Sequence, residues 1–193
     1  HHDLLGSLDL SFTDKVNAEV DVLFICLGHG NSSAFLEKHH FSETTIVIDL
    51  SNDFRLKADA HFGGREFVYG LPETNKAAIE KATAIANPGC FATAIQLALL
   101  PLAKAKKLTE TVHINATTGS TGAGVSLSPT THFTWRNNNL SWYKPFTHQH
   151  LGEIGESLAE LQGKDTAMLF LPQRGDFTRG IFASAYTEFD GSI

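Results

Sequence analysis

The sequence predicts an α/β protein in which an incomplete doubly wound (Rossmann-like) parallel sheet precedes an α+β domain. The first observation is a set of short, continuous apolar runs such as residues 22–27, which are typical of strands covered on both faces of a parallel sheet. The second is that helical patterns separate these runs. The third is a change of pattern after Cys90, where one strongly apolar helix is followed by strands and long polar loops.

The first part of the chain contains three strand-like runs rich in β-branched and apolar residues, at 21–27, 44–50 and 83–86. Short helices are predicted at 31–38 and 74–81, the second of them opened by Thr74. Strands and helices that alternate in this way favour βαβ units.

The second part begins with a helix predicted over about 91–106. Strands are then predicted at 112–116, 168–171 and 181–189, with a long polar loop at 126–147 and a helix from the end of that loop to about Leu161. We place the domain boundary near Pro88, which gives a partial dinucleotide-binding domain at 1–88 and an α+β domain at 89–193.

Composition narrows the classes of partner. The chain has 193 residues, of which 42% are hydrophobic and 19% charged, and this excludes a disordered chain. Its formal charge of −6 argues against nucleic acids and anionic membranes. The most apolar stretch, 92–103, is shorter than the ~20 residues that span a bilayer. Two cysteines and no secretory signal predict a cytoplasmic protein with free thiols and small-molecule or protein partners.

The segment 84–91 reads as a strand that enters a helix through a tight turn. Asn87 suits the N-cap, Pro88 the first helical position, and Gly89 a close backbone approach, which leaves Cys90 in the first turn. The helix dipole favours the thiolate there, so Cys90 is a candidate nucleophile. The alternative is a buried structural cysteine. Cys26, in the middle of an apolar run, is assigned to the core.

Two histidines, His148 and His150, stand at the start of the last predicted helix. A histidine at this place can act as a general acid and base. Surface histidines are one alternative, and a metal site that also uses Glu153 is another, although no cysteine pair or carboxylate cluster joins them.

Two glycine-rich turns follow predicted strands. The segment 117–124 has three glycines and four hydroxyl side chains, and its backbone N–H groups are suited to an anion or a phosphate. The turn Gly28-His29-Gly30 closes the first strand, at the edge where open α/β sheets bind ligands. Neither turn matches a nucleotide-binding fingerprint, so flexible turns without a ligand remain the alternative.

Taken together, these motifs resemble the N-acetyl-gamma-glutamyl-phosphate reductase family. The run Asn87-Pro88-Gly89-Cys90 followed by 91–94 is similar to the family's catalytic-cysteine signature, and 118–124 is similar to its glycine-rich loop. The turn at 28–30, the runs at 49–55 and 69–73, and His148-x-His150 followed by Glu153 add to the resemblance, which spans essentially the whole chain.

The resemblance implies a catalytic and dimerisation role for the second domain. It also implies that an N-acyl-γ-glutamyl phosphate is reduced by NADPH through a cysteine thioester in arginine biosynthesis, by a homo-oligomer (dimer or tetramer). Under this reading Cys90 is the nucleophile and His148 the acid and base, with His150 as the alternative. The cofactor-binding residues are Gly28, His29, Gly30, Gly119, Ser120, Gly122, Ala123 and Gly124, and the substrate-binding residues are Asn87, Gly89, His150 and Arg179.

The chain also departs from the family pattern. No Gly-rich opening βα turn precedes His1 and the chain stops before the family's closing helix, so we expect a truncated sequence in which the choice between NADP and NAD stays open. The family commonly has proline where Gly28 and Gly152 stand, and usually arginine where Gln149 stands.

Three alternatives follow. An aspartate-semialdehyde dehydrogenase is disfavoured because Gly89 stands where asparagine typically precedes that enzyme's cysteine. The others are a non-catalytic association module and a metal-dependent hydrolase. The N-acyl group, acetyl or succinyl, is left open.

Overall fold

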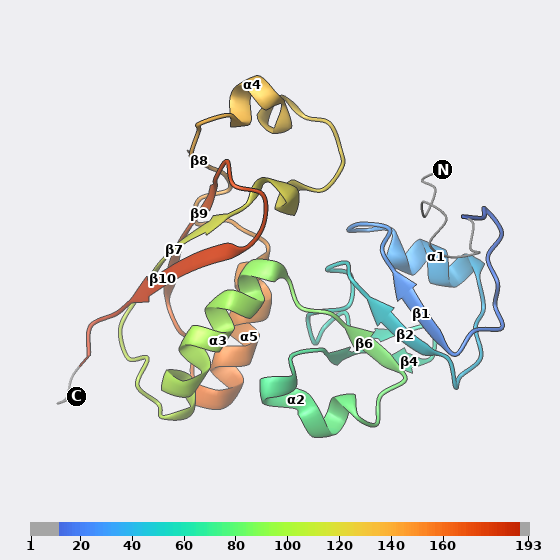
Figure 1. Ribbon diagram of the computed structural model, residues 1–193. Helices are drawn as coiled ribbons and strands as arrows, with labels where there is room; N and C mark the ends of the chain where they lie inside the picture. The colour runs from blue at the N-terminus through green and yellow to red at the C-terminus, as the bar shows by residue number, and fades with distance from the viewer. Residues whose placement is uncertain (1–11, 190–193) are drawn as a thin grey trace. The chain divides into compact units, whose positions relative to one another are not determined.

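The computed structural model describes residues 12–189 and divides the chain into two compact units (Figure 1). The first unit runs to Val68 and includes Ala77–Asn87, while the second contains Tyr69–Lys76 and everything described from Pro88 onward. Segment 69–76 therefore belongs with the second unit although it precedes the last strand of the first.

The first unit is built on a four-stranded sheet in the order β1-β2-β6-β5. Its strands are β1 (Val22–Ile25), β2 (Ile46–Asp49), β5 (Val68–Tyr69) and β6 (Ala84–Ala86), and β1, β2 and β6 run parallel. Helix α1 (Ser32–Lys38) follows β1, and a small hairpin joins β3 (His61–Phe62) to β4 (Arg65–Glu66). The predicted Rossmann-like parallel sheet is confirmed.

Strand β1 is covered on only one face by the residues that the structure describes. Ile25 is buried, whereas Val22 and Phe24, on the opposite face, are exposed. The strand ends at Ile25, so Cys26 lies beyond it with its side chain exposed. The assignment of Cys26 to the core was therefore wrong, because the apolar run continues past the residues that pair in the sheet.

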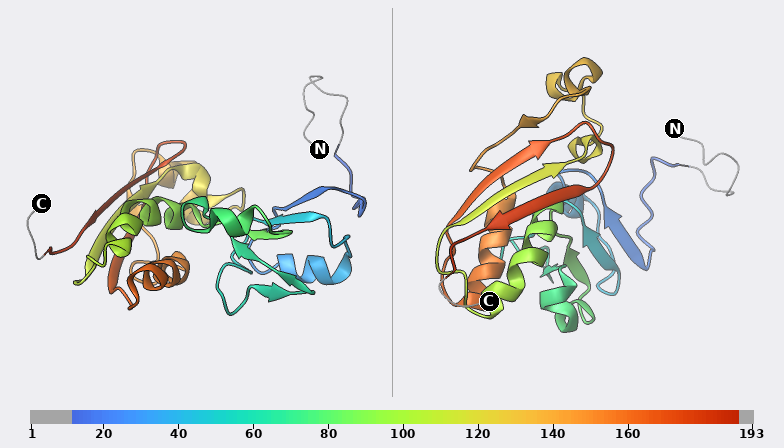
Figure 2. Two further views of the ribbon diagram at one scale, coloured as in Figure 1. Left: turned by 90° about the horizontal axis from the view of Figure 1, so that it is seen from below. Right: turned by 60° about the vertical axis from the view of Figure 1, so that its left-hand side comes forward.

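The second unit has a mixed four-stranded sheet in the order β10-β7-β9-β8, with α3 and α5 side by side on one face (Figures 1 and 2). Strands β7 (Val112–Thr118) and β9 (Met168–Arg174) are parallel, while β8 (Ser141–Trp142) and β10 (Ile181–Tyr186) are antiparallel to their neighbours. The helices are α3 (Cys90–Lys104) and α5 (His150–Gln162). Alternate residues of β7 are buried, as a sheet with one covered face requires.

The N-terminal cap of α3 lies two residues later in the chain than the turn at 84–91 suggests. Its first residue is Cys90 and its N-cap is Gly89, which has an extended backbone. Asn87 is not the cap and Pro88 is not the first helical residue, because the N–H of Asn87 still donates to the carbonyl of Asp49 in the parallel sheet. The chain must leave the sheet before it can turn into the helix.

The segment 126–147 contains short elements that its polar sequence does not predict. They are the 3-10 turn η2 (Pro129–Thr131), α4 (Phe133–Arg136) and strand β8, which follow the 3-10 turn η1 (Ser120–Ala123). In the first part of the chain, α2 (Pro72–Ile79) opens at Pro72 rather than at Thr74. No helix in the described part of the chain is long and apolar enough to cross a membrane.

Candidate active site

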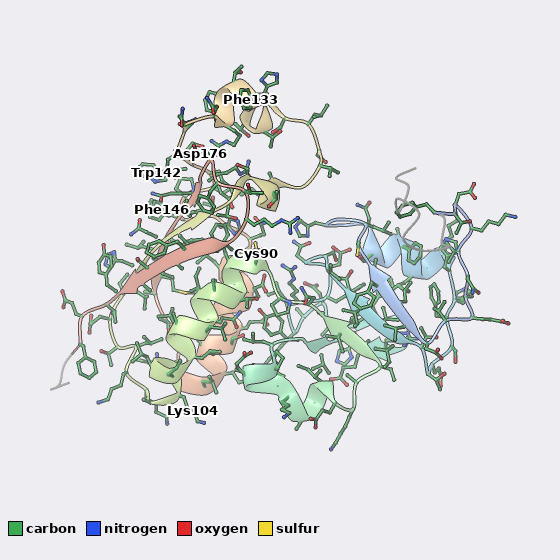
Figure 3. All side chains as sticks on the ribbon, in the orientation of Figure 1. Cys90, Lys104, Phe133, Trp142, Phe146 and Asp176 are labelled. Carbon is green, nitrogen blue, oxygen red and sulfur yellow. The ribbon has the colours of Figure 1, made fainter. Side chains whose placement is uncertain are left out.

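Cys90 occupies the N-terminal end of α3, at the opposite end of the helix from Lys104 (Figure 3). Its side chain is exposed and forms no disulfide, so Cys90 is not the buried structural cysteine of the alternative reading. The helix has 15 residues, and its dipole and first-turn N–H groups favour a negative charge at this end. The structure therefore presents a thiol where the thiolate is stabilised and reagents have access.

The imidazole of His150 packs directly against the turn that carries Cys90. A Cβ atom at Gly89 would overlap the ring of His150, so the turn needs glycine at this position. His150 is only 5% exposed, and its Nε2 lies 3.9 Å from Oε1 of Glu153. A proton-carrying ring is thus held next to the residue that precedes the thiol.

Glu153 ties the turn to two other elements. One carboxylate oxygen, Oε2, accepts hydrogen bonds from the N–H of Gly89 at 3.0 Å and from the hydroxyl of Tyr69 at 2.6 Å. The amide of Gln96 donates to the same hydroxyl at 2.7 Å. Glu153 is 3% exposed, so this carboxylate acts in a desolvated setting where its hydrogen bonds are strong.

His148 is buried deeper than a surface histidine would be. Its ring packs edge-on against Phe91, Tyr143 and Phe170 at centroid distances of 5.4, 5.6 and 5.5 Å. Its Nδ1 accepts a hydrogen bond from the N–H of His150 at 3.2 Å. Burial, reinforced by the positive charges of His150 and Lys144, lowers the pKa of His148 to about 4, so its ring is neutral at pH 7.

Tyr143 belongs to the same aromatic cluster as Phe91 and His148, and Arg174 packs on its ring. The guanidinium carbon of Arg174 lies 4.6 Å from the centre of the Tyr143 ring. Burial raises the pKa of Tyr143 to about 12, and the charge of Arg174 partly opposes this rise.

The backbone of the glycine-rich loop at 119–124 is hydrogen-bonded to a neighbouring segment of the chain. The N–H groups of Gly119, Ser120 and Thr121 donate to carbonyl groups of Gly180, Phe177 and Thr178, respectively. The prediction of free N–H donors at these three positions was therefore wrong, because carbonyl groups of the neighbouring segment 177–180 accept their hydrogen bonds. That segment carries Arg179, whose side chain is exposed.

The turn at 28–30 lies in the first unit and is braced by a carboxylate. Oδ1 of Asp53 accepts from the N–H of Gly30 at 2.6 Å, and Oδ2 accepts from the N–H of Ser32 at 3.0 Å. Gly28 and Gly30 both have positive φ, and the space where their side chains would stand is open. The turn thus offers a surface without side chains at its glycines, and two of its N–H groups, those of Gly30 and Ser32, are engaged by Asp53.

The structure brings four predicted site residues together in the second unit: Cys90, Gly89, His148 and His150. Asn87 and the turn at 28–30 belong to the first unit, and the loop at 119–124 packs beside Arg179. Sequence reasoning did not identify roles for Tyr69, Gln96, Tyr143 and Arg174. Only Glu153 had a usable signal, since it stands one helical turn after His150.

The described residues contain no group of three histidine, cysteine, aspartate or glutamate side chains that could hold a metal ion. His148, His150 and Glu153 therefore do not form the alternative metal site. Their geometry is instead that of a hydrogen-bonded support for the cysteine turn.

The chain belongs to the semialdehyde dehydrogenase family. Residues 90–193 match the family's dimerisation domain, and residues 3–82 match its NAD binding domain. Among curated proteins, the chain is 65% identical over its whole length to the N-acetyl-gamma-glutamyl-phosphate reductase of Flavobacterium johnsoniae, and 58% identical to that of Christiangramia forsetii. It spans 60% and 59% of the length of these two relatives.

Solved structures with the same fold are aspartate semialdehyde dehydrogenases. The type II protein from Vibrio cholerae matches 91% of this chain, with 58% of its own chain covered, at a TM-score of 0.63 and 18% identity. The protein from Candida albicans with NADP matches 91% of this chain, with 52% of its own covered, at a TM-score of 0.57 and 15% identity. These structures support the fold of both units.

Proposed function

We propose that the protein reduces an N-acyl-γ-glutamyl phosphate with NADPH to an N-acylglutamate semialdehyde and phosphate, as a step of arginine biosynthesis. One observation carries the proposal: an exposed Cys90 at the N-terminus of α3, with the ring of His150 against its turn. The high identity to reductases of this name supports the substrate class. We further propose a cytoplasmic homo-oligomer, dimer or tetramer, associated through the dimerisation domain.

The chemistry begins at the sulfur. The Cys90 thiolate attacks the γ-carbonyl carbon, a C–S bond forms, and the C–O bond to phosphate breaks with its electron pair leaving on phosphate. In the resulting thioester the carbonyl carbon accepts a hydride, and its oxygen takes a proton to give a thiohemiacetal. Loss of that proton and cleavage of the C–S bond then release the aldehyde and restore the thiolate.

NADPH supplies the hydride when it is bound. The open surface at Gly28 and Gly30 fits an uncharged part of a dinucleotide, because Asp53 already holds the neighbouring N–H groups and its charge would repel a phosphate. His29 shares this turn and its Nδ1 accepts from the N–H of Asn52, which fixes the ring. NADP rather than NAD is part of the proposal.

Proton transfer is best served by His150. Its ring contacts the turn of the nucleophile, whereas His148, the first choice from sequence, is neutral and enclosed by aromatic rings. His148 instead positions its neighbour by accepting the N–H of His150. Glu153 lies beside the same ring nitrogen that faces the Gly89 turn, with its Oε1 3.9 Å from Nε2 of His150.

Gly89 also separates two candidate substrates. A side chain at this position would displace His150, so the asparagine that precedes the cysteine in an aspartate-type enzyme does not fit this arrangement. The glutamyl phosphate is therefore the preferred substrate, and the N-acyl group is tested in two forms, acetyl and succinyl.

The test is the intact mass of the full-length protein after incubation with N-acetyl- or N-succinyl-glutamyl phosphate, without cofactor. We expect a single acyl adduct that disappears in Cys90→Ser and persists in the matched control Cys26→Ser, whose thiol is also exposed. An adduct with aspartyl phosphate alone would favour the aspartate-type reading. If no acyl phosphate gives an adduct, the result would favour the alternative that the protein is a non-catalytic association module.

A further inference from the structure

Arg174 ends strand β9 on the face that points toward α3. Residues 170, 172 and 174 share one face of the strand, and the first of them, Phe170, contacts Phe91 of α3 at 5.3 Å and His148 at 5.5 Å. Arg174 lies two steps further along the same face and packs on the ring of Tyr143, a side chain that feels the charges of both Arg174 and Cys90.

The guanidinium of Arg174 packs against the ring of Tyr143, with which it also shares a side-chain hydrogen bond. Its Cζ lies 4.6 Å from the centre of the Tyr143 ring, which in turn lies 6.3 Å from the ring of Phe91 and 5.6 Å from that of His148. Stacking of this kind covers one face of the guanidinium and leaves its N–H edges for hydrogen bonding.

Arg174 has an unused donor and a second arginine for a neighbour. Its Nε is buried and makes no hydrogen bond within the described residues. Arg136, which is 6% exposed, donates from Nη1 to the Arg174 carbonyl at 2.8 Å and from Nη2 to the Ser141 hydroxyl at 2.8 Å, and its own Nε is also buried without a bond. Asp176 is an acidic neighbour of Arg136, and its Oδ2 accepts a hydrogen bond from the N–H of Asn138.

Buried donors without acceptors cost free energy, and two neighbouring guanidinium groups add repulsion. An anion beside the Arg174 guanidinium would supply an acceptor for its N–H groups and offset the repulsion between the two arginines. Because a guanidinium presents parallel N–H groups, a planar carboxylate is the anion that it matches best, with phosphoryl oxygens as the second source of the same chemistry.

We propose that Arg174 binds an oxyanion of the substrate, a carboxylate in preference to the phosphoryl group, and so sets substrate orientation at Cys90. The assignment rests on the proposed function for the identity of the substrate. The charge and the position of Arg174 do not depend on that function.

The test compares two alkylating reagents on full-length protein in which Cys26 is replaced by serine, so that Cys90 is the reacting thiol of the described chain. Iodoacetate carries a carboxylate and iodoacetamide does not, and both report on the same thiolate. We expect Arg174→Gln to lower the ratio of the iodoacetate rate to the iodoacetamide rate by roughly tenfold or more. Lys144→Gln removes one positive charge from an exposed neighbour and should change the ratio less than twofold.

Protection experiments then identify the oxyanion. N-acetylglutamate should slow alkylation of Cys90 in the otherwise unchanged protein and lose this effect in Arg174→Gln; if inorganic phosphate shows that pattern instead, the phosphoryl group is the ligand and our carboxylate assignment falls. Arg174→Lys keeps the charge without the fork, so it should preserve the iodoacetate ratio while N-acetylglutamate protects less well. An unchanged ratio in Arg174→Gln, with an unchanged circular dichroism spectrum, overturns the proposal.

If Arg174→Gln does not fold, Arg174→Lys takes its place in the test. Full protection of Cys90 by N-acetylglutamate in Arg174→Lys would show that the guanidinium fork is unnecessary and would count against the proposal. Failure of the proposed function appears differently: no acyl adduct forms on Cys90 although the reagent ratio still depends on Arg174.

Discussion

His148 and His150 have different surroundings, and we therefore expect them to have different roles in the reaction. His150 contacts the Gly89 turn, and His148 is enclosed by Phe91, Tyr143 and Phe170. We expect His150→Asn to lower kcat by a factor of 10²–10⁴, as loss of a general acid and base does. His148→Asn should lower kcat less and leave the pH dependence of kcat in place. Steady-state rates of full-length protein from pH 5 to 9 measure both, and a greater loss in His148→Asn would restore the choice made from sequence.

The lowered pKa of His148 also links stability to pH. Between pH 6.5 and about 4 the unfolded chain binds a proton at His148 that the folded chain does not, so the free energy of unfolding falls as the pH falls through this window. Above pH 6.5 the term is constant. We expect the loss between pH 7 and pH 5 to be about 2 kcal/mol smaller in His148→Asn than in the wild type. Urea unfolding at the two pH values measures this difference, and equal losses would contradict the burial of a neutral ring.

Glu153 is the acceptor on which the cysteine turn depends. A glutamine in its place keeps the shape but turns one acceptor into a donor that faces the Gly89 N–H or the Tyr69 hydroxyl. We expect Glu153→Gln to destabilise the protein by about 1–3 kcal/mol. It should also slow alkylation of Cys90 by iodoacetamide. Glu110→Gln removes an exposed carboxylate of the same unit and serves as the control. If both variants behave alike in denaturant and toward the reagent, the turn does not need Glu153.

At this scale the sequence predicts reactive side chains better than their supports. Cys90 and the His-x-His pair stand out by residue type and by position next to helix starts. The Glu153 contact joins residues 64 positions apart, and the stacking of Arg174 on Tyr143 depends on the register of β8 with β9. Such pairings follow from tertiary packing, which local spacing does not encode.

Secondary-structure elements are predictable where apolar residues run without interruption. Strands β1, β2 and β6 of the first sheet and helices α3 and α5 were predicted close to their observed bounds, whereas the two-residue strand β5 was not predicted. Two-residue strands such as β8 were not, because two residues show no periodicity. The start of α3 was misplaced because a capping rule was applied to Asn87, whose backbone remains bonded to the sheet.

Helix α5 contains an interior glycine, Gly155, that can be replaced to stabilise the protein. Gly155 lies inside the helix, and a Cβ there would meet only the methyl carbon of Met168 at 3.8 Å, an ordinary contact. We expect Gly155→Ala to stabilise the protein by about 0.5–1 kcal/mol, because alanine loses less backbone entropy in a helix. Gly119→Ala is the opposite case, since its Cβ would come within 2.8 Å of the backbone of residues 178 and 179 and should lower the melting temperature. Calorimetry of both variants tests the pair, and a lower melting temperature for Gly155→Ala would count against the close fit of α5.

For the whole molecule, the predicted order of a parallel sheet followed by an α+β domain is confirmed, and so is the family. The chain path was harder to foresee. Tyr69–Lys76 belongs to the second unit although the last strand of the first unit follows it. Amino-acid composition does not reveal which of two units such a segment packs against, because the same hydrophobic residues can be buried in either core.

The distribution of one residue type gives the molecule a built-in optical signal. The chain has two tryptophans, and both, Trp135 and Trp142, lie in the second unit with side chains 47% and 63% exposed. Trp142 immediately precedes Tyr143, whose ring stacks on Arg174. Within residues 1–193, indole emission excited at 295 nm should therefore come from the second unit, which carries Cys90. Binding of a carboxylate beside Arg174 should shift that emission without any attached dye.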